Sequence, residues 1–260
     1  GIGFAIAKKL ASTPGHVCIL TSRDRARGEQ AVEDLSQEGL KAIFKQLDIG
    51  DRSSIERFAS EMEGEYGHCD ILVNNAGIAF KASDPTPFKE QAEPTLKTNF
   101  FDTVALTEKM LPLIRKSPAG RIVNVASMSG QLSILKSREL REAFTSLVLT
   151  KPELQLLMRK FVNDVKSGQH EAEGWPSTCY GMSKLGIIAY TVIAARMEAG
   201  SSVLVNSCCP GYCDTDMTSH RGRLSPEEGA RTPFMLTQMK DLAKGGVTGA
   251  FFQREALSRW

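Results

Sequence analysis

Short apolar runs alternate with amphipathic segments along most of the chain, and this alternation predicts the fold. The runs that read as strands are residues 17–21, 42–47, 71–73, 122–125, 203–207 and 249–252. Nearly continuous apolar strands separated by helices of ten or more residues are typical of a parallel sheet covered by helices on both faces. The pattern therefore predicts an α/β fold with a doubly wound parallel sheet, formed as a single domain over residues 1–260.

Polar residues and turn formers follow the predicted strands. They are Ser22-Arg23, Asp48-Ile49, Asn74 to Gly77, Ser127 and Pro210-Gly211. Ligands of doubly wound folds bind beyond the carboxyl ends of the strands. We therefore expect the functional residues to lie at these positions.

The chain opens on Gly1-Ile2-Gly3, followed by a helical stretch and then by the first apolar run. Glycines in such a turn let the backbone approach a pyrophosphate, while the helix N-terminus presents unpaired N–H groups. Only the last two glycines of a dinucleotide-binding loop are present, and no strand precedes them. The sequence thus predicts a chain from which the first strand is missing. Because that strand is central in the usual order, we expect the sheet to be split.

Composition is that of an ordinary enzyme, with 260 residues, 42% hydrophobic residues, 24% charged residues and a net charge of +2. The near-neutral balance indicates no nucleic-acid partner, and no apolar run approaches the ~20 residues that span a bilayer. The six irregularly spaced cysteines resemble buried free thiols, which favours a reducing, cytoplasmic location. Without a Cys-x-x-Cys pair or clustered histidines, we expect no metal site.

Tyr180 and Lys184 form a Tyr-x-x-x-Lys motif that begins 53 positions after Ser127. Positions i and i+4 share one face of a helix, which would bring the ammonium near the phenol. A nearby cation lowers the pKa of a phenol from its ordinary value of about 10 and makes proton exchange easier. The motif therefore indicates proton chemistry on a carbonyl, although it also occurs by chance on exposed helices.

An ordered set of motifs resembles the short-chain dehydrogenase/reductase family over almost the whole chain. The set comprises the Gly1-Ile2-Gly3 turn, Asn74-Asn75-Ala76-Gly77, Asn99, Ser127, the Tyr180 and Lys184 pair, and Pro210-Gly211 with Thr215. Segments around Trp175 and Cys208 further resemble the monomeric NADPH-dependent carbonyl reductases of animals. The resemblance implies reduction of quinones, aromatic aldehydes and ketones, with ketosteroids and prostaglandins as further candidates. A catalytically inactive, truncated nucleotide-binding fragment is the alternative.

The resemblance also implies catalytic roles. Tyr180 would protonate the carbonyl oxygen, and Ser127 would hydrogen-bond the same oxygen. Lys184 would lower the pKa of Tyr180 and bind the nicotinamide ribose, and the backbone of Asn99, in a distorted helix, would hold a water that links Lys184 to solvent. For Ser127 the alternative is a serine that caps the next turn, and for Asn99 it is a side chain bonded to local backbone.

The residues that the resemblance assigns to the cofactor are Gly1, Ile2, Gly3, Asp48, Ile49, Asn74, Ala76, Gly77, Tyr180, Lys184, Pro210, Gly211 and Thr215. The choice of cofactor is argued from the end of the second strand of the usual fold. There Ser22 stands where an acidic residue would bind the ribose of NAD, and Arg23 offers a charge suited to phosphate, so NADPH is favoured. Alternatively, Arg23 is a solvated loop charge, and Asn74 and Gly77 are turn residues.

The separation between Ser127 and Tyr180 is much longer than the family usually has, which predicts a helical insertion at about 132–176. Thr150 and Glu153 have the spacing of a capping box, and an apolar stripe follows over 154–165. The insertion would cover helices that form the subunit interface in many relatives, so we expect a monomer. Trp175 and Tyr212 are expected to bind substrate together with Ser127 and Tyr180. Cys209 is either a reactive thiol at the rim or a buried strand cysteine.

Overall fold

The computed structural model describes residues 1–81 and 83–260 and has alternating strands and helices. The strands are β1 (Cys18–Ser22), β2 (Ala42–Gln46), β3 (Ile71–Asn74), β4 (Arg121–Val125), β5 (Leu204–Cys209), β6 (Phe251–Gln253) and β7 (Ala256–Ser258). The helices are α1 (Ile2–Ala11), α2 (Arg25–Gln37), α3 (Arg52–Tyr66), α4 (Phe88–Leu96), α5 (Thr103–Ile114), α6 (Arg138–Thr145), α7 (Lys151–Lys166), α8 (Cys179–Met197), α9 (Pro226–Gly229) and α10 (Arg231–Thr237). All six predicted strands are present within one or two residues at each end.

Strand β1 pairs parallel with β2, strands β3 to β6 pair parallel with one another, and β7 pairs antiparallel with β6 at the edge. The pairing is in two parts: β1 with β2, and β3-β4-β5-β6-β7 in that order. The expected split thus falls between β1 and β3. Strand β4 lies inside the larger part, and all five of its residues are buried. The carboxyl end of β4 therefore lies between those of β3 and β5, at the edge where the polar residues that follow the strands are expected.

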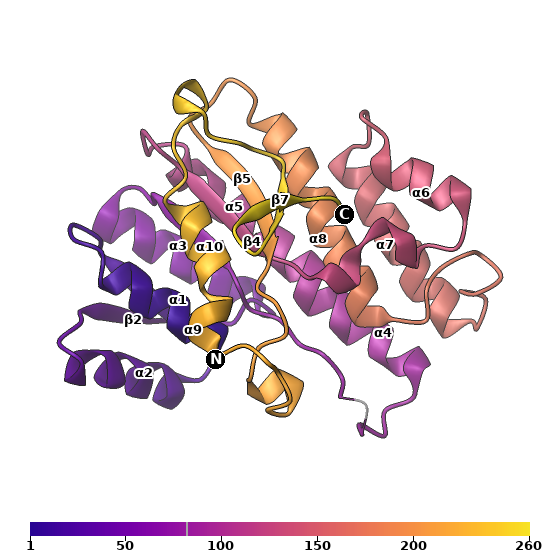
Figure 1. Ribbon diagram of the computed structural model, residues 1–260, viewed down its shortest axis with the longest axis horizontal. Helices are drawn as coiled ribbons and strands as arrows, with labels where there is room; N and C mark the ends of the chain where they lie inside the picture. Colours follow the sequence, from indigo (N-terminus) through magenta and orange to yellow (C-terminus); the bar gives the residue numbers. More distant parts are fainter. Residues whose placement is uncertain (82) are drawn as a thin grey trace.

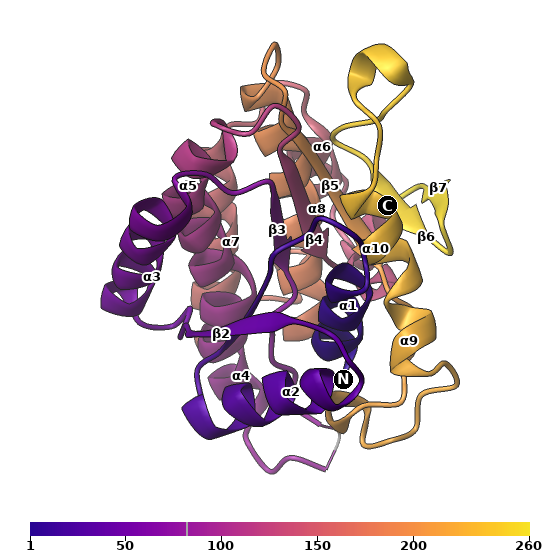
Figure 2. The same ribbon diagram turned by 90° about the vertical axis from the view of Figure 1, so that its left-hand side faces the viewer.

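Helices cover both faces, as the side view in Figure 2 shows. Helices α3, α5 and α8 pack against one another or against one face of the strands, and α1, α2 and α10 pack against the other. Helix α8 is buried around most of its circumference, as expected of a helix enclosed on all sides. The doubly wound α/β fold predicted from the sequence is confirmed.

The insertion forms α6 and α7 at one end of the molecule (Figure 1). The predicted capping box is present: the Glu153 carboxylate accepts from the backbone N of Thr150 at 2.8 Å, and the Thr150 hydroxyl accepts from the backbone N of Glu153. The stripe that follows buries Leu154 and Met158 against α4 and α8. These contacts make the insertion part of the main core.

Trp175 is a correction to the sequence analysis. Its side chain is 0% exposed, and its ring packs edge-on against Phe144 and Phe161. The indole Nε1 donates to the Asp164 carboxylate at 2.7 Å. A ring that is enclosed by the helices of the insertion cannot line a substrate pocket, so its role is to hold the insertion together.

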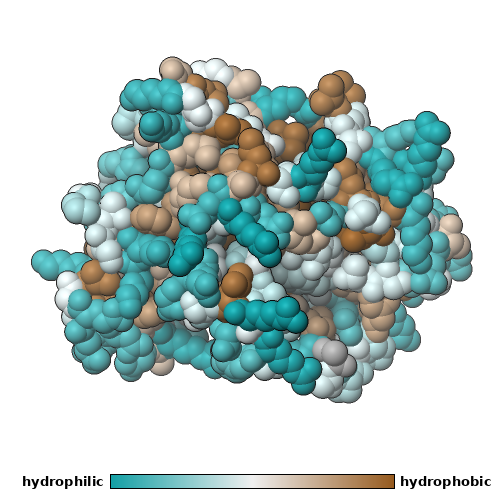
Figure 3. All heavy atoms as spheres, in the orientation of Figure 1, coloured by the Kyte–Doolittle hydropathy of each residue, from teal (hydrophilic) through white to brown (hydrophobic). Residues whose placement is uncertain are grey.

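The face shown in Figure 3 is covered mainly by hydrophilic residues, with hydrophobic residues gathered in small groups. Among the residues that the structure describes, no helix combines the length and the apolar character needed to cross a bilayer.

Candidate active site

The residues singled out from the sequence gather at the carboxyl edge of the parallel strands. Ser127 follows β4, Arg23 follows β1, and Asp48 follows β2. The segment after β5 brings Thr215 to the start of α1, where its Cγ2 lies 4.0 Å from the position of a Cβ on Gly1. Figure 1 shows this segment near the N-terminus and α9. The N-terminal residue and the segment after β5 thus meet beside the expected cofactor turn.

Two glycines let the turn after β4 approach the start of α8. A Cβ on Gly130 would lie 2.5 Å from the backbone N of Leu185, and one on Gly181 would lie 2.6 Å from the backbone O of Ser129. The close approach brings Ser127 beside Tyr180. The sequence analysis missed both glycines, although a glycine inside a helix, where it is unfavourable, was an available signal for Gly181.

Ser127 caps the turn that follows β4 and also lies beside Tyr180. Its Oγ accepts from the backbone N of Ser129 at 3.1 Å and so caps the 3-10 turn Met128–Gly130. The same hydroxyl lies close enough to the Tyr180 phenol to influence its pKa. The capping bond fixes the orientation of the hydroxyl without removing it from the site.

The pKa of Tyr180 is raised above its ordinary value by burial, and the Ser127 hydroxyl only partly offsets that effect. The expectation that Lys184 lowers this pKa stays a prediction. The Lys184 Nζ lies 5.6 Å from the centroid of the Tyr180 ring and donates instead to the backbone O of Val125 at 2.7 Å. At neutral pH the phenol is therefore protonated, which is the form that a proton donor requires.

Lys184 is 5% exposed, and burial lowers its pKa from 10.5 to about 8. Its partner, the Val125 carbonyl, belongs to the last residue of β4. The bond ties α8 to the polar edge of the sheet. A lysine in this position has a proton to exchange near neutral pH.

Asn99 lies in a π-helical turn, Lys97–Asp102, between α4 and α5. Its Oδ1 accepts from the backbone N of Ile78 at 2.7 Å, while its Nδ2 donates to the Ile78 carbonyl at 2.8 Å and to Ser183 Oγ at 3.0 Å. The partners are thus the loop after β3 and helix α8, and not the local backbone considered as the alternative. Because the side chain of Asn99 is engaged in these bonds, the expected role of holding a water falls to its backbone in the π-helical turn.

The start of α1 has the features of a phosphate cradle. Gly1 provides no side-chain cap, and no acidic residue stands in the first turn, so its N–H groups remain for an anion. A Cβ on Gly3 would lie 2.5 Å from Asn75 Nδ2, and one on Gly77 would lie 3.2 Å from Asn99 Oδ1 and 3.7 Å from the Lys184 ammonium. Glycine at these two positions lets Asn75 and Asn99 approach the turn, and the uncapped N–H groups of α1 fit the phosphates of a dinucleotide.

Arg23 is exposed after β1, and no described carboxylate pairs with it. The neighbouring Asp24 points elsewhere, because its Oδ1 accepts from the backbone N of Arg27 at 2.9 Å and caps α2. Asp48 is half-buried and accepts from the backbone N of Gly50 at 2.9 Å. Arg23, which has no carboxylate partner among the described residues, is therefore suited to bind a phosphate group, because Asp24 is already used in capping α2.

Asn74 is a second correction. Its side chain is 7% exposed, and its Nδ2 donates to Thr107 Oγ1 and to Asn124 Oδ1, both at 2.8 Å. Asn124 in turn donates to Thr191 Oγ1 at 2.9 Å. The Asn74 side chain therefore links β3 to β4 and α5, and it is Asn75 that faces the glycine turn.

The loop after β5 carries the remaining candidates. Tyr212 is 54% exposed and stays available to a substrate, and Gly211 has a φ of +90°, which favours glycine. Cys209 is buried, and its Sγ accepts from the backbone N of Gly211 at 3.4 Å. This position is that of a strand cysteine, the second of the two alternatives.

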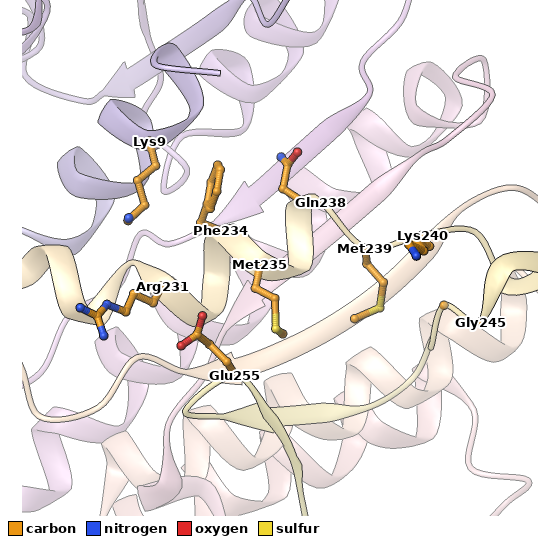
Figure 4. A pocket seen from close by; sticks show the side chains of 10 residues that line it. Lys9, Arg231, Phe234, Met235, Gln238, Met239, Lys240, Gly245 and Glu255 are labelled. Carbon is orange, nitrogen blue, oxygen red and sulfur yellow. The ribbon is translucent and has the colours of Figure 1, made fainter. Parts of the chain in front are cut away.

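A groove of about 470 Å³ runs along α10 (Figure 4). Its lining consists of Lys9, Arg231, Phe234, Met235, Gln238, Met239, Lys240, Gly245, Gly246 and Glu255. None of the residues that carry the expected chemistry lines it. The candidate active site is therefore defined by converging side chains and not by this groove.

Comparisons with known proteins agree with this geometry. The short chain dehydrogenase family model matches residues 1–137. Carbonyl reductase (NADPH) 1 of Bos taurus is 46% identical over 265 residues, covering 100% of this chain and 95% of the relative, and carbonyl reductase (NADPH) 3 of Mus musculus is 47% identical over 91% and 86%. The chain belongs to the short-chain dehydrogenase family.

The fold of this short-chain dehydrogenase is shared with solved structures. Salutaridine reductase from Papaver somniferum superposes with a TM-score of 0.88 at 30% identity, covering 97% of this chain and 96% of that one. The family resemblance derived from the sequence motifs is confirmed.

Proposed function

We propose that this protein is an NADPH-dependent carbonyl reductase. The observation that carries the proposal is the convergence of Ser127, Tyr180 and Lys184 at the carboxyl end of β4. The relatives named carbonyl reductase (NADPH) support it, since they are 46–47% identical and match most or all of the chain. They favour an enzyme over the alternative of an inactive nucleotide-binding fragment.

NADPH, when bound, supplies the hydride that reduces the substrate carbonyl. The Tyr180 phenol, protonated because burial raises its pKa, donates a proton to the carbonyl oxygen. The Ser127 hydroxyl, held by its bond to the Ser129 amide, donates a hydrogen bond to the same oxygen as negative charge develops there. A fixed donor needs little reorganisation during the reaction.

Lys184 replenishes the phenol. Its lowered pKa of about 8 lets the ammonium release a proton near neutral pH, and the Val125 carbonyl holds the group at the edge of the sheet. The backbone of Asn99 continues the path to solvent through a water. Lys184 would also bind the nicotinamide ribose.

The cofactor would lie along the edge of the strands. Gly1, Ile2 and Gly3 would bind the pyrophosphate, and Arg23 would bind the 2′-phosphate. Asp48 and Ile49 would contact the adenine, while Ala76 and Gly77 would form a wall beside the adenosine ribose. Pro210, Gly211 and Thr215 would hold the nicotinamide, and Tyr212 would line the substrate side.

Quinones, aromatic aldehydes and ketones form the proposed substrate class, because Tyr212 offers an exposed aromatic wall. We propose further that the chain is one domain and a cytoplasmic monomer. The packing of helix α7 of the insertion against α4 and α8 supports the monomer, because the resemblance implies that these neighbouring helices form the subunit interface in many relatives.

Tyr180→Phe tests this function. Turnover of a quinone or ketone should fall by about 10²–10⁴-fold, the effect of losing a positioned general acid, with NADPH affinity nearly unchanged. Tyr190→Phe is the matched control, because Tyr190 is a buried tyrosine of the same helix. Its turnover should stay close to that of the unaltered enzyme. Retention of most turnover in Tyr180→Phe would refute the assignment.

A further inference from the structure

The segment that carries Thr215 folds back on itself as a compact loop. The Asp214 amide donates to the Leu224 carbonyl at 2.8 Å, and the Leu224 amide donates to the Tyr212 carbonyl at 3.1 Å, which closes the base of the loop. A Cβ on Gly222 would lie 1.9 Å from the backbone C of Cys213, so glycine permits this crossing. Residues 214–224 thereby form a closed loop.

Within the loop, His220 lies between two carboxylates. Its Nδ1 is 2.7 Å from Asp214 Oδ1, and its Nε2 is 3.1 Å from Asp216 Oδ1. A neutral imidazole has one donor nitrogen, whereas the imidazolium has two. Both contacts are therefore satisfied only by the charged form. The two aspartates flank Thr215 in the sequence, so the bridge closes over that residue.

The backbone of the loop reinforces the bridge. The His220 amide donates to the Thr215 carbonyl at 3.0 Å, and the Thr215 amide donates to Thr218 Oγ1 at 3.1 Å. Ser219 and His220 have φ values of +51° and +57°, a left-handed conformation that side chains other than glycine seldom adopt. Such a conformation needs support from its surroundings, which the two carboxylates provide.

We propose that His220 is a positioning residue for the nicotinamide end of the cofactor: by bridging Asp214 and Asp216, it holds Thr215 facing Gly1 and the start of α1. The inference rests on the proposed function, because Thr215 acts on the cofactor only if the protein binds NADPH. The inference adds His220, which lies outside the motif of Pro210, Gly211 and Thr215, as a residue that controls the position of Thr215.

The bridge depends on pH. Asp214 and Asp216 raise the pKa of His220 above its ordinary value of about 6.5. The stabilisation of the folded loop by the bridge is therefore complete below pH ~6.5, and it is lost as pH rises through the higher pKa that His220 has in the folded state. Of the neighbouring α9, Glu228 accepts a hydrogen bond from the Ser225 amide, and neither Glu227 nor Glu228 is among the groups that shift the pKa of His220.

The test is NADPH affinity against pH, measured by quenching of protein fluorescence, for the unaltered protein and His220→Asn. Asparagine tolerates the left-handed conformation, so the substitution is expected to remove the imidazole without changing the backbone conformation of the loop. Because the bridge is exposed, we expect affinity to fall about two- to fivefold in the variant at pH 6, and this difference to vanish by pH 9. Asp214→Asn should give a similar loss, and the double variant no further loss.

His68→Gln is the matched control, since His68 pairs with Asp70 at 3.3 Å in another loop and should leave NADPH affinity unchanged. Amide hydrogen exchange without cofactor provides a second readout: exchange at His220 and Thr215 should accelerate in His220→Asn. Equal affinity and equal exchange in variant and unaltered protein would overturn the inference. Failure of the unaltered protein to bind NADPH would overturn the proposed function instead, with the exchange result still reporting on the bridge.

Discussion

Gly130 and Leu185 approach so closely that a Cβ on the glycine would lie 2.5 Å from the leucine's backbone nitrogen. This contact presses the turn after β4 onto α8 and brings Ser127 beside Tyr180. The distance between the two hydroxyls that we propose as catalytic is therefore set by a residue without a reactive side chain.

Gly130→Ala should force the turn and α8 apart. We expect a loss of about 1–3 kcal/mol in the free energy of unfolding, as for an overpacked core, together with lower turnover. Urea unfolding and steady-state kinetics measure the two effects. Gly64→Ala is the control, because Gly64 lies within α3 with nothing within 4 Å, and it should be neutral or slightly stabilising. Similar results for both variants would contradict the role of the close contact.

Lys184→Met should change how stability depends on pH. Between pH 8 and 10.5 the unfolded chain keeps the lysine proton while the folded protein has lost it, so the unaltered protein gains stability as pH rises. The gain over the variant should grow by about 2–3 kcal/mol from pH 7 to pH 10. Urea unfolding at the two pH values measures it.

Lys45→Met serves as the control for that experiment. Hydrogen bonds to Glu65 and Glu61 raise the pKa of Lys45, so it stays charged in both states up to pH 10. Its difference from the unaltered protein should be flat from pH 7 to pH 10. A flat difference for Lys184→Met as well would show that burial does not perturb Lys184.

Arg23→Glu should raise the KM for NADPH far more than the KM for NADH. Loss of a charge-assisted phosphate contact and added repulsion together cost on the order of 2–4 kcal/mol. Arg25→Glu provides the comparison, because Arg25 is exposed two residues later and is already paired with Glu29 at 3.1 Å. Equal effects of Arg23→Glu on both cofactors would mean that the arginine is a bystander.

Trp175→Phe and Tyr212→Ala should have opposite consequences. The first leaves the Asp164 carboxylate without its indole donor in the insertion, and should cost about 1–3 kcal/mol of stability with an unchanged KM for substrate. The second removes an exposed ring, and should raise that KM with little change in thermal unfolding. A raised KM in Trp175→Phe alone would restore the tryptophan to the substrate pocket.

Much of the fold was predictable because its signals are local. Apolar runs predicted strands β1 to β6, and the spacing of Thr150 and Glu153 predicted the start of α7. The three-residue strand β7 was missed because Ala256 and Leu257 are exposed at the edge and carry no apolar pattern. Local patterns identify elements best when both faces of an element are buried.

The sequence predicts that the candidate residues lie at one edge of the sheet, but it does not predict their contacts. Motif spacing places Lys184 above Tyr180, yet it cannot reveal that the Val125 carbonyl binds the ammonium. Nor does the sequence distinguish Asn74, which is buried in a polar network, from Asn75, which faces the glycine turn. Such distinctions depend on contacts between residues far apart in the chain.

The π-helical turn Lys97–Asp102 makes the site sensitive to the number of residues between α4 and α5. An α-helix advances by about 100° of rotation per residue, so the wider turn offsets the phase of α5 relative to α4. Deleting one residue there would restore a regular helix and rotate Asn99 away from Ile78 and Ser183, even though every side chain of the site remained in the sequence. The register between the two halves of this helix is thus as much a determinant of the active site as the identity of any residue in it.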